Sequence, residues 1–197
     1  MRLTAKQLLV AFGTNQTFGD ISPDGLIASA LREIESDLAA DVQPSGLFRT
    51  PCFPAGAGPD YVNAAALVTM RQARTADQVL AALHAVEARF GRVRHTRWGA
   101  RTLDIDLLAM GEVVLPDLQT HQHWRDLPAE AQQRQAPDQL ILPHPRLQDR
   151  AFVLVPLADV AADWRHPILG RSVVEMLDAL PQADRDEVVR LAPAASA

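Results

Sequence analysis

The order of secondary-structure signals constrains the fold of this chain more than any other feature of the sequence. Two helix starts alternate with short apolar runs that have the length of strands. The first start is Ser22-Pro23-Asp24, which combines a hydroxyl N-cap, a proline at the first helical position and an acid in the first turn. The second is Thr75 with Gln78, which has capping-box spacing. The pattern therefore predicts two helices separated by strands.

Four apolar runs are predicted as the strands around these helices. They are Gln7–Phe12, Val42–Arg49, Tyr61–Met70 and Thr102–Met110. One helix falls between the first and second runs, and the other between the third and fourth, which gives the order βαββαβ of the ferredoxin-like fold. The predicted fold class is therefore α+β, with a ferredoxin-like βαββαβ core in a single domain over residues 1–197.

The rest of the chain is predicted to add to this core. Residues 116–139 are polar and rich in Gln, and we interpret them as an insertion with one short helix near Ala129–Arg134. Extra C-terminal elements follow, and the last is a helix that begins at the capping box of Ser172 and Glu175. Residues 192–197 are expected to form a frayed tail.

Composition excludes several classes of protein. Hydrophobic residues make up 48% of the chain and charged residues 22%, which is unlike a disordered or fibrous sequence. The single cysteine, Cys52, excludes an internal disulfide framework and is expected to be a small packing residue. The apolar run Leu8–Phe12 is too short for an export signal, and no run reaches the length of a membrane span. We therefore expect a cytoplasmic protein.

His121 and His123 lack a third zinc ligand nearby, so a solvated loop is the preferred interpretation.

Positive charge is concentrated in one segment. Residues 88–103 contain five arginines and no acid, whereas the whole chain has a net charge of −5, so the remainder carries −10. An acidic protein does not bind nucleic acid over its whole surface. A local cationic segment is instead typical of a site for a small polyanion.

Asp104 and Asp106 follow this segment in the predicted strand. Alternate side chains of a strand share a face, so the two carboxylates point the same way while Leu103, Ile105 and Leu107 point into the core. Their roots lie about 6.6 Å apart, which allows both to bind one divalent ion or a pair. Oxygen ligands suit Mg²⁺, and arginine forks match phosphoryl oxygens.

Other interpretations of these residues remain open. The two acids are also compatible with a solvated strand end, and the arginines with an exposed face. A two-metal nuclease would use the same acids, and a ferredoxin-like module that binds nucleotide or RNA would use the same arginines. The chain contains no Gly-Lys pair, which excludes an ordinary P-loop enzyme.

The segment Arg97–Asp106 (RWGARTLDID) resembles the signature of the 6-hydroxymethyl-7,8-dihydropterin pyrophosphokinase family. Further matches occur in family order across roughly residues 8–180, outside the insertion. They are Gly13-Thr14-Asn15, Arg49-Thr50-Pro51, Asp60–Ala65, Gly91–Arg94, Pro143-His144 and Arg150-Ala151-Phe152. The resemblance implies transfer of the β,γ-diphosphate of ATP to the hydroxymethyl group of the reduced pterin, with release of AMP.

The resemblance also implies roles for individual residues. Asp104 and Asp106 would hold two Mg²⁺ ions, and Arg92 and Arg101 would steady the transferred group. The ATP site would comprise Glu87, Arg94, Arg97, Trp98, Leu107, His144 and Arg150. The pterin would stack between Tyr61 and Phe152, in a pocket completed by Thr50, Pro51, Phe53 and Asn63. The implied partners are ATP and the pterin, without nucleic acid or membrane, and we expect a monomer or a weak dimer.

Simpler roles are possible for several of these residues. Tyr61 and Phe152 could also belong to a hydrophobic core. Glu87 could be an acid on the surface of a helix, and His144 could lie in a loop where its ring is hydrogen-bonded. The chain departs from the family pattern at His84, His95, Gln139 and Pro145, which affects the ATP contacts rather than the metal pair. The insertion is the largest departure and is compatible with a lid or an interface.

Overall fold

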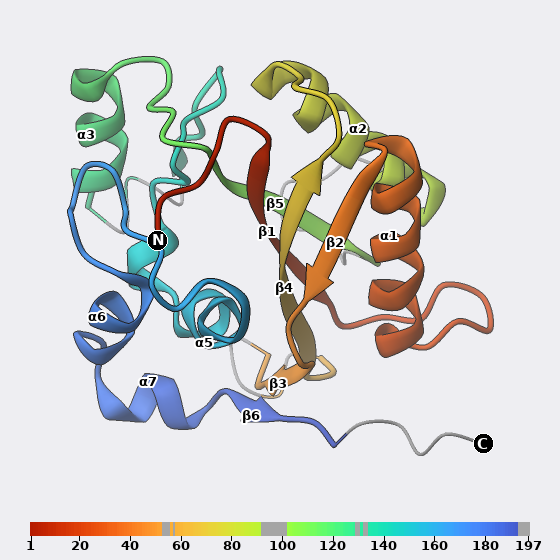
Figure 1. Cartoon of the computed structure of the whole chain (residues 1–197). Helices are drawn as coiled ribbons and strands as arrows, with labels where there is room; N and C mark the ends of the chain where they lie inside the picture. The colour runs from red at the N-terminus through yellow and green to blue at the C-terminus, as the bar shows by residue number, and fades with distance from the viewer. Residues whose placement is uncertain (53–55, 57, 92–101, 129–130, 132–133, 193–197) are drawn as a thin grey trace.

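The computed structural model describes residues 1–52, 56, 58–91, 102–128, 131 and 134–192. Its elements follow the chain in the order shown in Figure 1. They are β1 (Gln7–Thr14), α1 (Pro23–Asp37), β2 (Ala40–Pro44), β3 (Phe48–Thr50), β4 (Tyr61–Met70), α2 (Ala76–Arg89), β5 (Asp104–Met110), α3 (Leu118–Asp126), the 3₁₀ turn η1 (Leu147–Asp149), α5 (Ala151–Ala161), α6 (Val173–Asp178), α7 (Gln182–Asp186) and β6 (Val189–Arg190).

The sheet has the predicted ferredoxin-like topology. Its strands follow the order β5-β1-β4-β3-β6, and β2 also pairs with β4. Every pair is antiparallel, including β1 with both β4 and β5. The helix starts are confirmed as well, because the Ser22 side chain accepts a hydrogen bond from the Gly25 N–H and Thr75 with Gln78 forms a complete capping box.

Alternating side chains of β1 divide the core into two layers. Leu8, Val10 and Phe12 pack with α1 and α2 on one face, whereas Leu9 and Ala11 pack with α5 and α6 on the other. Figure 1 shows this division, with α1 and α2 on one side of the sheet and α5 to α7 on the other. β1 is thus buried on both faces of the sheet, and its pairing with β4 and β5 determines the positions of these two strands.

The prediction of one strand over Val42–Arg49 is wrong, because β2 ends at Pro44 and β3 begins at Phe48. Ser45 lies in the break, where its N–H donates to the Ala65 carbonyl and its hydroxyl accepts from the Ala65 N–H. A side chain that replaces part of the backbone ladder interrupts the pairing register. The strand predicted over Thr102–Met110 begins two residues later, at Asp104.

The insertion and the C-terminus also differ from the predictions. The insertion contains α3, which was not predicted. In the segment predicted as a helix near Ala129–Arg134, Ala131 and Arg134 are helical and the other residues lie outside the described part of the chain. The helix after Ser172 is confirmed, but it is not the last element, since α7 and β6 follow it. β6 pairs with β3 at the sheet edge. The predicted tail at 192–197 lies almost entirely outside the described residues.

The preference for a solvated loop at His121 is wrong. His121 lies in α3 and is buried, and its Nε2 donates to the Pro143 carbonyl at 2.9 Å. Its ring meets the ring of His166 edge to face, with centroids 5.9 Å apart, and the ring of Trp164 also packs against His166, with centroids 5.8 Å apart. None of the helices in the described residues has the length and apolar character needed to cross a membrane.

His166 is held as a neutral residue by its surroundings. Its Nδ1 accepts hydrogen bonds from the N–H groups of Ile168 and Leu169, at 3.2 and 3.3 Å. Burial lowers the pKa of His166 to about 4, and the nearby His121 and Arg125 act in the same direction. In the unfolded chain the same histidine takes up a proton at its ordinary pKa of about 6.5. The contribution of neutral His166 to stability is therefore complete above that pH and is lost as the pH falls below it.

We therefore expect acidification to weaken the fold through His166. The free energy of unfolding should be about 2 kcal/mol lower at pH 5 than at pH 7.5, because the pKa of His166 is about 4 in the folded chain and about 6.5 in the unfolded chain. The measurement is urea unfolding at both pH values for the wild type and for His166→Asn, whose side-chain oxygen retains the acceptor but does not titrate. The variant should lose about 2 kcal/mol less than the wild type. Equal losses would contradict this account.

Candidate active site

The two acids of β5 stand on the face that was predicted for them. Ile105 and Leu107 are buried in the layer beneath α1 and α2, whereas Asp104 and Asp106 are only half-buried. The prediction that these carboxylates share one face, away from that core, is therefore confirmed. Their face is the one that α5 covers, because Asp106 pairs in register with Ala11, which packs with α5.

Small residues on the neighbouring strands leave space beside these acids. Asp104 pairs with Gly13 of β1, which pairs in turn with Asn63 of β4, and the next row on this face is Asp106, Ala11 and Ala65. Directly opposed residues in an antiparallel sheet share a face. Asp104 and Asn63 therefore lie on one face, two strands or about 10 Å apart, with only the hydrogen of Gly13 between them.

Glu87 fixes the backbone between the two acids. It is buried near the end of α2, and its Oε1 accepts the Ile105 N–H at 2.8 Å. β5 lies at one end of the strand order, so this side chain satisfies a donor at the sheet edge. The alternative that Glu87 is a surface acid is wrong, and its role in binding ATP stays a prediction.

A cavity of about 490 Å³ opens along the outer edge of β5. Four of the predicted site residues line it: Asp106, Leu107, His144 and Arg150. The other lining residues come from α2, β5, α3 and the segment that returns from the insertion. They are Leu80, His84, Ile105, Trp124, Gln135, Pro137, Asp138, Gln139, Leu140, Ile141, Pro145 and Arg146. The cavity thus brings together β5 and the departures from the family pattern at positions 84, 139 and 145.

Arginine and a neutral histidine give the cavity a positive end. The Arg150 guanidinium lies 3.8 Å from the Asp106 carboxylate, and burial lowers the pKa of Arg150. Burial also lowers the pKa of His144 to about 3, and the positive charges of Arg150 and Arg146 act in the same direction. The His144 Nδ1 accepts the Arg146 N–H at 3.1 Å, so the neutral ring carries its proton on Nε2. His144 is thus a hydrogen-bond donor that stays uncharged at neutral pH.

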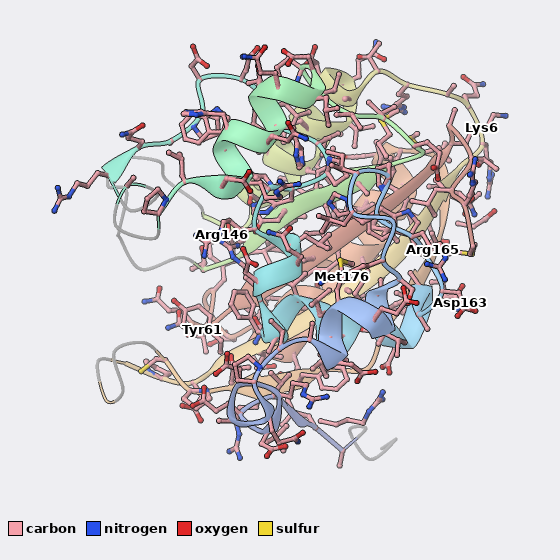
Figure 2. All side chains as sticks on the ribbon, turned by 90° about the vertical axis from the view of Figure 1, so that its left-hand side faces the viewer. Lys6, Tyr61, Arg146, Asp163, Arg165 and Met176 are labelled. Carbon is pink, nitrogen blue, oxygen red and sulfur yellow. The ribbon has the colours of Figure 1, made fainter. Side chains whose placement is uncertain are left out.

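The polar pair predicted for the pterin pocket lies across β3 and β4. Asn63 is buried, and its Nδ2 donates to the Thr50 Oγ1 at 2.9 Å. Tyr61 faces Thr50 in the register and is half-buried. Figure 2 shows Tyr61 on the same side of the molecule as Arg146, which lines the cavity.

The two predicted stacking residues do not belong to the hydrophobic core. Phe152, in the first turn of α5, is 42% exposed, and the Arg150 guanidinium lies 5.7 Å from the centroid of its ring. Tyr61 is half-buried. The alternative that both are core aromatics is therefore wrong, and both rings are accessible to a ligand.

The neighbouring loop is closed by Cys52. Its Sγ donates to the Gly58 carbonyl at 3.0 Å and accepts the Gly58 N–H at 3.2 Å. Cys52 is buried, as expected for a packing residue, and Pro51 beside it is exposed. Six predicted site residues lie outside the described residues: Phe53, Arg92, Arg94, Arg97, Trp98 and Arg101.

Sequence reasoning missed eight residues of the cavity wall: Leu80, Trp124, Gln135, Pro137, Asp138, Leu140, Ile141 and Arg146. Trp124 carried a usable signal, since a large aromatic residue in an otherwise polar segment requires something to pack against. Leu80 carried none, because an apolar residue on a helix is normally assigned to the core.

Removal of the Glu87 carboxylate should destabilise the sheet edge. Glu87→Ala leaves the buried Ile105 N–H without its acceptor, which costs about 1–3 kcal/mol. Glu87→Gln keeps an acceptor oxygen and should lose less. Urea unfolding of both variants measures this, with exposed Glu35→Ala on α1 as the control that stays within about 0.5 kcal/mol of the wild type. If Glu87→Ala were as stable as that control, the structural role of Glu87 would be wrong.

Comparison with known proteins supports the resemblance seen in the sequence. The chain is 37% identical over 135 residues to a 2-amino-4-hydroxy-6-hydroxymethyldihydropteridine pyrophosphokinase of Synechocystis sp., covering 68% of this chain and 56% of that protein. It is 42% identical over 123 residues to the Pseudomonas aeruginosa protein of the same name, covering 62% of each. It is 32% identical over 150 residues to that of Methylorubrum extorquens, covering 76% of this chain and 78% of that protein. Two of these three alignments thus span less than two thirds of the relative.

Solved structures agree on the fold. A crystal structure of Plasmodium falciparum HPPK-DHPS A437G with pteroate superposes with a TM-score of 0.57 at 12% identity, over 87% of this chain and 42% of that one. The model of the 7,8-dihydro-6-hydroxymethylpterin-pyrophosphokinase (HPPK) family matches residues 9–162, which include β5, the cavity wall and α5. This chain therefore belongs to the HPPK family.

Proposed function

We propose that this chain transfers the β,γ-diphosphate of ATP to 6-hydroxymethyl-7,8-dihydropterin. The hydroxymethyl oxygen forms a bond to the β-phosphorus, the bond from that phosphorus to the α,β-bridging oxygen breaks, AMP leaves, and the hydroxyl proton passes to solvent. The names of the relatives and the family support this reaction. The observation that carries it is the row of Asn63, Gly13 and Asp104 across the sheet, which ends two residues from Asp106 of the cavity wall.

This row separates two sites of different chemistry. On one side, Asp106, Arg150 and His144 line a cavity that suits a triphosphate, since guanidinium and imidazole N–H groups donate to phosphoryl oxygens. On the other side, the Asn63 amide offers both a donor and an acceptor to the polar edge of a pterin. The carboxylates stand between them, where a group passes from one substrate to the other.

The two acids fit Mg²⁺ rather than a metal with an all-protein shell. No cluster of three or more His, Cys, Asp or Glu side chains suited to a metal occurs in the part of the chain that the structure describes. Mg²⁺ commonly takes one or two carboxylates and completes its shell with water and substrate phosphates. Asp104 and Asp106 would hold two such ions, whose positive charge offsets the negative charge that the triphosphate carries.

The side chains of the site act by orientation and charge. Arg150 is positioned to bind a phosphate beside Asp106, and neutral His144 adds a donor without a second full charge. Tyr61 and Phe152 have accessible rings on which a flat heterocycle can stack. Such positioning suits phosphoryl transfer, whose loose transition state requires little of a general base.

The setting follows from the substrates and the composition. We propose a cytoplasmic enzyme that acts as a monomer or a weak dimer, with ATP and the pterin as partners. A single cysteine and the use of ATP both support a reducing, intracellular location.

The metal-binding acids should be needed for turnover but not for folding. With ATP, Mg²⁺ and the reduced pterin, the wild type should release AMP, and Asp104→Asn or Asp106→Asn should lower the rate at least 100-fold, because amides replace the anionic ligands. The assay follows AMP by chromatography. Asp41→Asn, on the exposed end of β2, is the matched control and should keep the wild-type rate.

Two results would contradict the proposed reaction. One is AMP release by the wild type that does not require the pterin, and the other is ADP as the product. Near-normal rates in either β5 variant would exclude the metal site while leaving the reaction open to another set of ligands.

The Asn63 amide should determine binding of the pterin alone. Asn63→Ala removes the group that bonds Thr50 and should weaken pterin affinity about tenfold or more, the effect of one lost hydrogen bond of about 1.4 kcal/mol. Affinity for a non-hydrolysable ATP analogue should not change. Calorimetric titration with each ligand measures both. Thr69→Ala, at the far end of β4, is the control. Equal weakening of both ligands would contradict a separate pterin pocket.

A further inference from the structure

The insertion forms part of the cavity wall, and its helix is fixed to the loop that carries His144. The chain enters the insertion through a bridge between Leu115 and Leu142, with backbone hydrogen bonds of 2.9 and 3.2 Å in the two directions. The buried His121 of α3 then donates to the Pro143 carbonyl, next to His144. These bonds hold α3 in a defined position beside the cavity.

Trp124 is the residue that this anchoring places at the cavity. It follows His121 by three positions, so both side chains lie on neighbouring faces of α3. Trp124 is half-buried and lines the cavity, and its ring packs against the ring of His123 with centroids 5.8 Å apart and an interplanar angle of 77°. An aromatic side chain that packs against a neighbouring ring thus forms part of the surface that a ligand in the cavity would contact.

The rest of the wall indicates what this plane can bind. Leu80, Leu107 and Leu140 are apolar and come from three different segments. Charged and polar side chains line the rest of the wall: His84, Asp106, Gln135, Asp138, Gln139, His144, Arg146 and Arg150. A triphosphate requires the charged part of the wall, which leaves the apolar part, with Trp124, for the remainder of the nucleotide. A flat purine gains from offset stacking on an indole and from apolar contacts on its other side.

We propose that Trp124 stacks on the purine base of ATP, so that the insertion supplies a wall of the base subsite. This inference rests on the proposed function, because it requires ATP to occupy the cavity. It assigns the insertion a role in binding and in the choice of nucleotide.

The test compares ligands with and without a base. Affinity is measured by calorimetry with Mg²⁺ for a non-hydrolysable ATP analogue and for inorganic tripolyphosphate. Trp124→Ala should weaken binding of the ATP analogue about 10- to 100-fold, the usual effect of a lost aromatic stack on a base. Tripolyphosphate, which has no base, should bind both proteins within twofold.

Companion variants separate stacking from effects on folding. Trp124→Phe retains an aromatic ring and should keep most of the affinity, whereas Trp124→Leu keeps apolar volume without a ring and should lose it. Gln122→Ala, on the exposed side of the same helix, is the matched control and should bind like the wild type. Melting temperatures report whether each variant is folded.

The outcomes distinguish this inference from the proposed function. If the wild type fails to bind the ATP analogue, the proposed function and the inference are both wrong. If the wild type binds it and Trp124→Ala binds equally well, the inference alone is wrong. Equal weakening of tripolyphosphate and the ATP analogue by Trp124→Ala would also overturn it, since Trp124 would then act on the whole site.

Discussion

The site depends on the alternation of side chains along β5. Ile105 and Leu107 pack beneath α1 and α2, and this packing turns Asp104 and Asp106 to the opposite face. The Ile105 N–H donates a hydrogen bond to the Glu87 carboxylate, which holds the backbone between the two acids in place. A shift of one residue in the register would bury both acids and expose both apolar side chains, so the core itself specifies the position of the acids.

Small residues on β1 and β4 make this arrangement useful. Gly13 and Ala11 stand beside the acids on the same face, where larger side chains would fill the space that a substrate needs. Different groups lie on the two sides of the acids: Arg150 and His144 line the cavity at the edge of β5, and Asn63 bonds Thr50 on the other side.

Local signals in the sequence were sufficient for much of the fold. The capping residues Ser22 and Thr75 placed both core helices, and the alternation around Asp104 placed the acids. The break at Ser45 was missed because it depends on a contact with Ala65, twenty residues away. The burial of His121 was missed for the same reason, since its partners Pro143 and His166 are distant in sequence.

The helix α3 in the insertion was missed, although Asp117 followed by Thr120 is an N-cap signal that precedes it. In the site, the acids were predicted from the strand pattern, whereas Arg150, His144 and Asn63 were predicted through the family resemblance. Trp124 was not, because its contact with the cavity depends on how the insertion folds back.

The most direct test of the account is the location of the metal in a complex with both substrates. Crystals grown with Mg²⁺, a non-hydrolysable ATP analogue and the pterin should show two ions between the carboxylates of Asp104 and Asp106 and the phosphates, with the pterin hydroxymethyl group directed at the β-phosphorus. Ions bound elsewhere, or carboxylates directed away from the nucleotide, would contradict it.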